Sequence, residues 1–128
     1  MNKLFGIGTD IVDISRIKKI FIKNKVFKSK IFSKKEIKYC ESRSNKIAAY
    51  SKRFAAKEAF VKALGTGIAK GISLKEISVN NSKNGAPFIE LLGKTKLIAK
   101  KLINKNSQIY LSLSDEKKYA LAMVIISC

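Results

Sequence analysis

One stretch, residues 51–67 (SKRFAAKEAFVKALGTG), constrains the fold of this chain more than any other. It is long enough for about four turns of helix, and it ends in two glycines, where helices usually stop. Phe54, Val61 and Leu64 recur at spacings that place them on one side of such a helix. We therefore expect this helix to be a core element, with its apolar side packed against the rest of the chain.

Glu58 is the unusual residue on this helix. It lies between Phe54 and Val61 on the same side, so its carboxylate is predicted to point towards an apolar surface. A charge in such a place costs several kcal/mol unless it is paired. Lys62 follows at i+4 and could supply the pairing. Taken alone, the pattern fits a structural ion pair as well as it fits a functional site.

The length and composition fit one globular domain, residues 1–128, with a modest core. Hydrophobic residues make up 46% of the chain, but no apolar run approaches the ~20 residues of a membrane helix. The first residues, MNKLFGIGTD, lack the apolar stretch and cleavage site of a signal peptide. A cytoplasmic protein without a membrane segment is expected.

The cysteine and histidine counts exclude several classes of site. The chain has two scattered cysteines, Cys40 and Cys128, and no histidine. The common zinc-ligand spacings and a disulfide framework are therefore excluded. A nucleophile activated by histidine, as in Ser-His or Cys-His enzymes, is excluded as well.

The net charge of +18 suits an acidic partner, such as nucleic acid, an anionic membrane surface, a phosphorylated ligand or an acidic protein. The lysines are spread along the chain instead of forming one block. There are only three arginines, which argues against a surface that reads bases, because bidentate arginine is the usual tool for that task.

Local patterns predict the remaining elements. Gly6 and Gly8 in the first strand are expected to let its backbone approach another element closely. Asp13 is expected to cap the helix that follows the first strand, and Ser33 and Glu36 form a capping-box pattern. The sequence NNSKNG at 80–85 predicts a hairpin. The predicted strands cover 3–12, the end of 72–79, 87–92, 108–114 and 119–127, and the predicted helices 14–25, 34–41, 46–65 and 93–104. The fold class is α+β, with helices packed on one side of a mainly antiparallel sheet.

Asp10 is the second acid that invites a functional interpretation. It lies in GIGTDIVDI near the end of the first strand, where a carboxylate can also simply accept backbone amides. Together with Glu58 it forms a candidate pair of hard oxygen ligands. Two carboxylates, waters and substrate phosphate oxygens are the usual ligands of Mg²⁺. An anion at this place would be surrounded by Arg53, Lys57, Lys62 and the turn 65–67.

Five blocks of sequence, in this order, resemble the small, bacterial-type holo-acyl-carrier-protein synthase family of 4′-phosphopantetheinyl transferases. They are GIGTDIVDISRI, FSKKEIKYC, RFAAKEAFVKALGTGI, NGAPFIEL and SLSDEKKYALAMVI. The similarity runs from about residue 4 to residue 126, and the first and third blocks are the most specific.

The resemblance implies the 4′-phosphopantetheinyl transferase fold and a transfer reaction that supports fatty acid biosynthesis. The 4′-phosphopantetheine group would move from coenzyme A to a serine of apo-acyl carrier protein, with release of adenosine 3′,5′-bisphosphate. Mg²⁺ would be the cofactor. The resemblance further implies homotrimers with active sites at the subunit interfaces.

Roles follow for the residues that match the family motifs. Asp10 and Glu58 would bind Mg²⁺, which also contacts the coenzyme A pyrophosphate, and Lys62 would meet the phosphate under attack. Glu58 or a metal-bound water could act as the base for the carrier serine, and both alternatives stay open. The coenzyme A pocket would be lined by Arg53, Lys57, Gly65, Thr66 and Gly67, with Gly85–Pro87 near the adenine.

The basic first helix resembles the surface on which the family docks its acidic carrier protein. Arg16 is the motif residue of this surface, and Lys19 and Lys23 extend it along the helix. One departure from the family stands at Asp115, where a histidine commonly follows the SLS stretch. Any contact of that histidine with coenzyme A is lost or replaced in this chain.

Two rival hypotheses use other features of the sequence. A nucleic-acid-binding module would explain the charge of +18, but it makes no use of Asp10 and Glu58 and has few aromatic residues for stacking. A family member without activity would explain Asp115. The retention of Asp10, Glu58 and Lys62 argues against that hypothesis.

Overall fold

The computed structural model describes residues 3–68 and 71–128. Within them a first strand is followed by a run of helices and then by two antiparallel strand pairs separated by one helix, which confirms the predicted α+β class. The elements in chain order are β1 (Leu4–Asp13), α1 (Ile14–Lys23), α2 (Phe27–Ile31), α3 (Lys34–Glu41), α4 (Lys46–Leu64), the 3₁₀ turn η1 (Leu74–Glu76), β2 (Ile77–Asn81), β3 (Pro87–Leu91), α5 (Gly93–Leu102), β4 (Ile109–Asp115) and β5 (Tyr119–Ser127).

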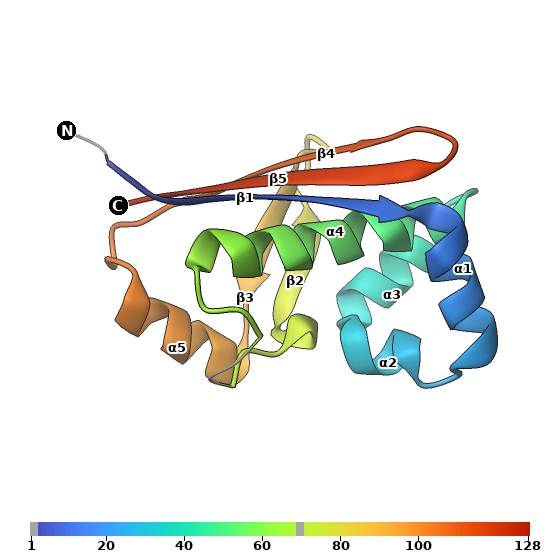
Figure 1. Ribbon diagram of the computed structural model, residues 1–128, viewed down its shortest axis with the longest axis horizontal. Helices are drawn as coiled ribbons and strands as arrows, with labels where there is room; N and C mark the ends of the chain where they lie inside the picture. The colour runs from blue at the N-terminus through green and yellow to red at the C-terminus, as the bar shows by residue number, and fades with distance from the viewer. Residues whose placement is uncertain (1–2, 69–70) are drawn as a thin grey trace.

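The strands form two antiparallel sheets. The larger has the order β1-β5-β4, and the smaller is the hairpin β2-β3. Figure 1 shows the larger sheet as one layer, with α4 running beneath it and the other helices further away on the same side. The predicted arrangement of helices on one side of an antiparallel sheet is confirmed.

Helix α4 is the centre of the molecule. It contacts all strands of the larger sheet and also α1, α3 and β2, so most of its surface is covered. Its six alanines are all buried, and Ala59 and Ala63 let the backbone of β1 come close. The prediction of a single apolar side was therefore too narrow, because neighbouring elements cover this helix on almost all sides.

Two glycines in β1 bring the strand against α4. A Cβ atom on Gly6 would collide with the carbonyl of Ala63, and one on Gly8 would collide with the carbonyl of Ala59. The expected close approach of backbone at these glycines is confirmed. Side chains alternate along a strand, so Asp10 lies on the same side as Gly8 and faces α4.

The predicted helix ends are largely confirmed. The side chain of Asp13 accepts a hydrogen bond from the backbone N–H of Ser15, and Ser33 and Glu36 form a complete capping box. Asn45 caps α4, and Gly65 ends that helix with a φ of 83°.

Helix α2 was not predicted. The helix expected over 14–25 ends at Lys23, and a short helix follows at Phe27–Ile31. Phe27 packs against Phe21 and Phe32, with ring centroids 5.6 and 6.3 Å away. This turn of helix is held by tertiary aromatic contacts and carries no side-chain cap of its own. None of the described helices is both long and apolar enough to cross a membrane.

Candidate active site

Asp10 and Lys62 meet where β1 passes over α4. The Nζ of Lys62 lies 3.2 Å from Oδ1 of Asp10 and donates to the carbonyl of Thr9 at 3.0 Å. The side chain of Lys62 is 57% exposed and that of Asp10 is 17% exposed. Lys62 thus pairs with Asp10, while the i+4 pairing with Glu58 that the sequence suggested is not among the ion pairs of the described residues.

Glu58 stands half-buried beside this pair. Burial raises the pKa of Glu58, and the negative charge of Asp10 raises it further, while Lys62 and Arg16 act in the opposite direction. Two carboxylates therefore share one small region that two cations also face. Such an arrangement favours a bound cation, because a cation removes the repulsion between the carboxylates.

The donor set at this place fits a hard divalent cation. Asp10 and Glu58 would supply carboxylate oxygens, which are the ligands that Mg²⁺ prefers. The described residues contain no group of three or more histidine, cysteine, aspartate or glutamate side chains arranged for a metal. The protein would therefore provide two ligands, and water and substrate oxygens would complete the coordination, as is usual for Mg²⁺.

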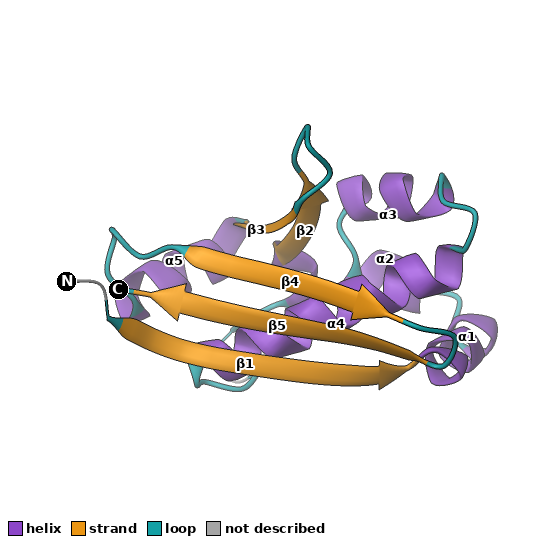
Figure 2. Cartoon of the chain, turned by 90° about the horizontal axis from the view of Figure 1, so that it is seen from above, coloured by secondary structure: helices purple, strands orange, loops and turns teal. Residues whose placement is uncertain are grey.

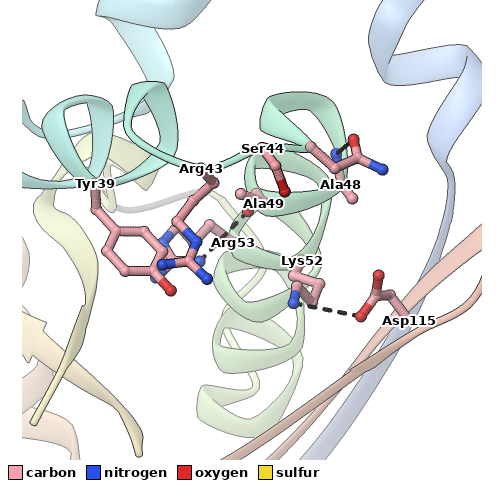
Figure 3. Close-up of a pocket in the computed structure, with 9 residues that line it drawn as sticks. Tyr39, Arg43, Ser44, Ala48, Ala49, Lys52, Arg53 and Asp115 are labelled. Carbon is pink, nitrogen blue, oxygen red and sulfur yellow. Dashed lines mark hydrogen bonds and ion pairs between the residues drawn. The ribbon is translucent and has the colours of Figure 1, made fainter. Parts of the chain in front are cut away.

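A second charged site, which we call the basic pocket, lies towards the other end of α4 (Figure 3). It is a cavity of about 180 Å³ that contains three cationic side chains and one carboxylate. It lies beside the N-cap of α4, where unpaired backbone N–H groups favour an anion. The lining residues are Tyr39, Arg43, Ser44, Asn45, Ala48, Ala49, Lys52, Arg53 and Asp115.

Arg53 connects the basic pocket to the β2-β3 hairpin. Its side chain is almost fully buried, and its guanidinium carbon lies 4.1 Å from the ring centroid of Tyr39. One terminal nitrogen donates to Oδ1 of Asn81 at 2.5 Å, and Asn81 in turn donates to the carbonyl of Gly85 at 2.9 Å. Since Asn81 also pairs with Pro87 in the hairpin, the structure brings Arg53 close to the segment Gly85–Pro87.

Asp115 forms an ion pair with Lys52 in the lining of the basic pocket, as the dashed line in Figure 3 shows. The Nζ of Lys52 lies 3.3 Å from Oδ1 of Asp115. Lys52 comes from α4 and Asp115 from the end of β4, so the pair links the helix to the sheet. Asp115 is thus occupied with a lysine of the basic pocket.

Lys57 lies in the protein interior, with no exposed surface on its side chain. Its Nζ contacts Oε1 of Glu36 at 2.6 Å and the carbonyls of Leu74 and Ile77 at 2.9 and 2.6 Å. Three acceptors match the three N–H groups of the ammonium. The structure therefore contradicts the prediction that Lys57 lines a coenzyme A pocket.

Glu36 completes this buried network. Besides Lys57, its carboxylate accepts the backbone N–H of Ser33 and that of Val79. Burial lowers the pKa of Lys57, and the charge of Glu36 opposes this effect. The capping role predicted for Glu36 is therefore confirmed, but the same carboxylate also joins α3, α4 and β2.

The turn Gly65-Thr66-Gly67 follows directly on α4, at the end opposite to the basic pocket. Gly65 and Gly67 both have positive φ, and the Thr66 hydroxyl donates to the carbonyl of Gly67 at 2.8 Å. Lys62 precedes this turn by less than one helical turn. At 1.5 Å per residue, the backbone of Lys52 lies roughly 15 Å from that of Lys62 along the helix.

The three basic residues predicted to dock a carrier lie exposed on α1. Arg16 is the one nearest to the carboxylates, since its charge acts on the pKa of Glu58. Lys19 and Lys23 follow at i+3 and i+7 and extend the basic surface away from the site. The docking role of Arg16, Lys19 and Lys23 stays a prediction.

Sequence reasoning missed four residues of the basic pocket: Tyr39, Arg43, Lys52 and Asp115 in its role as partner of Lys52. Arg43 carried a usable signal, because it is one of only three arginines in the chain. Tyr39 carried no such signal, since a tyrosine on a short helix is commonly either a core residue or a surface residue. Its role becomes visible only when the rings and guanidinium groups are brought together, with Arg43 5.3 Å from the Tyr39 ring centroid.

Comparison with known proteins identifies the class to which this fold and site belong. Residues 6–124 match the 4′-phosphopantetheinyl transferase superfamily. The chain belongs to this superfamily, and within it to the holo-[acyl-carrier-protein] synthases, as the sequence motifs predicted.

The matched relatives are enzymes that carry this name. A holo-[acyl-carrier-protein] synthase from Pelagibacter ubique (strain HTCC1062) is 47% identical over 125 residues, which cover 97% of each chain. The crystal structure of the holo-ACP-synthase from Plasmodium yoelii matches with a TM-score of 0.84 and 35% identity, over 99% of this chain and 97% of that one. A holo-(acyl-carrier-protein) synthase from Bacillus anthracis, solved in complex with CoA (3′,5′-ADP), matches with a TM-score of 0.78 and 32% identity, over 97% and 96%.

Proposed function

We propose that residues 1–128 form one domain that transfers 4′-phosphopantetheine from coenzyme A to a serine of apo-acyl carrier protein. The observation that carries the proposal is the meeting of Asp10, Glu58 and Lys62 between β1 and α4. Transfer of a phosphate-linked group depends on neutralising and positioning the phosphate more than on covalent chemistry. A cation held by two carboxylates, together with one exposed lysine, would neutralise the phosphate and hold it in position.

Magnesium is the cofactor that we propose for this site. Asp10 and Glu58 would hold it, and when bound it would neutralise negative charge on the pyrophosphate of coenzyme A. Lys62 would then move from Asp10 to a phosphate oxygen, which its exposure allows. Arg16 would contribute positive charge from the side of α1.

The basic pocket would receive the other phosphate-bearing end of coenzyme A. Coenzyme A carries a pyrophosphate and a separate 3′-phosphate, and the basic site near Lys62 and the basic pocket are likewise separate along α4. Arg43, Lys52 and Arg53 would face the 3′-phosphate, while Pro87 and its hairpin would lie near the adenine. The Bacillus anthracis relative in complex with CoA (3′,5′-ADP) supports a coenzyme A site in this fold.

Assembly into a homotrimer is also proposed, and the outer face of the larger sheet supports it. Figure 2 looks onto this face, which no described helix covers. Apolar side chains project from it that are 39–62% exposed, and an exposed apolar surface of this kind marks a contact with another protein. They are Phe5, Ile7, Ile11, Tyr110, Tyr119, Leu121 and Met123.

The trimer can be tested by sedimentation analysis of the purified protein. A trimer has a mass about three times the 14.3 kDa of the chain. A lysine in place of Met123, which is 42% exposed at the middle of the outer face, should reduce the mass to that of one chain. A wild-type protein with the mass of one chain at all concentrations would contradict the proposal.

The transfer itself is tested with purified protein, Mg²⁺, coenzyme A and an apo-acyl carrier protein. We expect the mass of the carrier to increase by one phosphopantetheine group. A control enzyme known to modify the same carrier shows that the carrier is competent. If the control modifies the carrier and this protein does not, the proposed function is wrong.

A further inference from the structure

The ion pair of Lys52 and Asp115 stands in an unexpected place. The basic pocket gathers three cations, Arg43, Lys52 and Arg53, around a cavity of about 180 Å³, which suits an anion. Asp115 adds a carboxylate to this same lining. A fixed negative charge repels an incoming phosphate, so Asp115 opposes the chemistry for which the other charged residues are suited.

The three cations are held to different degrees. Arg53 is nearly fully buried, lies against the Tyr39 ring and donates to Asn81, so its position is fixed by the fold. Arg43 is exposed and also lies near the Tyr39 ring. Lys52 contacts Asp115 through its flexible end, and both side chains of this pair are about one third exposed.

A partly exposed ion pair is weak and exchanges readily, because water screens it and can replace either partner. A phosphate carries more negative charge than one carboxylate and would compete well for Lys52. We therefore expect the ion pair of Lys52 and Asp115 to break when an anion enters the pocket, whereas the contacts of Arg53 should remain.

We propose that Asp115 is an internal counter-ion that the 3′-phosphate of coenzyme A displaces from Lys52, and that it thereby sets how strongly the protein prefers coenzyme A to dephospho-coenzyme A. This inference rests on the proposed function. Without ligand, Asp115 neutralises Lys52 and keeps it near the pocket. With ligand, Lys52 turns to the 3′-phosphate, and the loss of its contact with Asp115 reduces the binding free energy that this phosphate contributes. The carboxylate therefore acts as a specificity-determining residue.

The test measures binding of coenzyme A and of dephospho-coenzyme A, which lacks only the 3′-phosphate, by calorimetry at low salt. In Asp115→Asn the shape is kept and the charge is lost. We expect coenzyme A to bind about 3- to 5-fold more tightly, in the upper part of the range for one partly exposed charge contact, with dephospho-coenzyme A changed by less than about 1.5-fold. Glu116→Gln is the matched control, since it removes the next acid, for which the described residues show no ion pair, and should change neither ligand.

A second variant shows whether Asp115 acts through Lys52. Lys52→Gln should weaken coenzyme A selectively. Adding Asp115→Asn to it should tighten coenzyme A by clearly less than in the wild-type background, because only the direct repulsion of the phosphate is then removed and Asp115 has no lysine to hold. Equal tightening of both ligands by Asp115→Asn, or weaker binding of coenzyme A, would overturn this inference alone. If no variant binds coenzyme A and no carrier is modified, the proposed function is overturned instead.

Discussion

Two of the four lysines of helix α4, Lys57 and Lys62, lie five residues apart in opposite surroundings. Lys57 has no exposed side-chain surface and contacts three acceptors, among them the buried carboxylate of Glu36. Lys62 is 57% exposed and donates to two acceptors, one of them the carboxylate of Asp10. Both are lysine-carboxylate pairs, but only the second can change its partner without unfolding the protein around it.

The difference shows how one helix can hold the fold and the site together. The Lys57–Glu36 pair is closed, because each of its polar atoms has a protein partner and water does not reach it. Breaking a closed pair leaves a buried charge without compensation, which is strongly destabilising. The Lys62–Asp10 pair is open, so water or a substrate phosphate can replace either partner at little cost.

Glu58→Gln, next to the open pair, should have the largest effect. It removes one of two proposed metal ligands while keeping the shape of the side chain. We expect kcat/KM for carrier modification to fall by ~10³-fold or more, equivalent to about 4 kcal/mol at 1.36 kcal/mol per decade, with an unchanged circular dichroism spectrum. Glu116→Gln serves as the control. A fully active Glu58→Gln protein would remove Glu58 from the metal site.

Lys57→Met tests the closed pair. The free energy of unfolding should fall by about 3 kcal/mol, near the lower end for a broken buried pair, because Glu36 keeps two backbone N–H donors. Urea denaturation measures the change. The matched control is Lys62→Met, the same substitution five residues further along α4, which should alter the free energy of unfolding by less than about 0.5 kcal/mol. Equal losses in the two variants would contradict the distinction between closed and open pairs.

The same Lys62→Met variant tests the open pair through activity. Removing the exposed ammonium should lower kcat/KM by ~10²-fold, or about 2.7 kcal/mol, because charge stabilisation of the reacting phosphate is lost. The stability of the protein should hardly change. Lys100→Met, on the exposed side of α5, is the control for the general loss of one positive charge. Activity of Lys62→Met close to that of Lys100→Met would show that Lys62 does not meet the phosphate.

Much of the fold follows from local sequence signals. Asp13, Ser33 and Asn45 cap the helices that follow them, and a helix cap involves only residues within one turn. Gly6 and Gly8 were expected to mark a close backbone approach, which α4 makes. The caps could be predicted because cause and effect lie on the same few residues, whereas the glycines predicted a close approach but not that α4 makes it.

Which charged side chains are buried, and which partners they contact, could not be predicted in this way. The partners of Lys57 come from Glu36, Leu74 and Ile77, which are 17–21 residues away in the chain. Nothing in the local pattern around Lys57 states that three acceptors will meet there. Its neighbour Glu58 could be assigned to a site because its carboxylate was expected on the apolar side of the helix and could be paired with Asp10, and the family resemblance supports that assignment. Lys57 was placed around the same anion, but in the structure its side chain points into the interior.

The two faces of β5 are another case. Its nearly continuous apolar sequence predicts a strand, but not that its side chains divide between two environments. In the structure Ala120, Ala122, Val124 and Ile126 are buried against the helices, whereas Leu121 and Met123 project from the outer face. An alternation of burial without an alternation of polarity is invisible in sequence. It becomes visible only when the position of α4 is known.

A third charged cluster, around Glu41, has more protein partners than the open pair but is more exposed than the closed pair. Changing it should have the smallest effect. Glu41 accepts hydrogen bonds from Lys28 and Tyr50 and pairs with Lys46, but it is 37% exposed. The hydrogen bond from Lys28, followed by that from Tyr50, lowers the pKa of Glu41 to about 2 from its ordinary 4.5. A lowered pKa means that the folded state favours the charged carboxylate, so this stabilisation is complete above pH 4.5 and is lost as the pH falls towards 2.

Glu41→Gln should therefore lower the free energy of unfolding by about 1 kcal/mol at pH 7, a modest value because water screens the cluster. The loss should shrink steadily between pH 4.5 and pH 2, where the wild-type carboxylate becomes protonated. Urea denaturation at several pH values measures it, with Glu116→Gln as the control. A loss that stays the same from pH 7 to pH 2 would mean that Glu41 stabilises the fold by its shape and not by its charge.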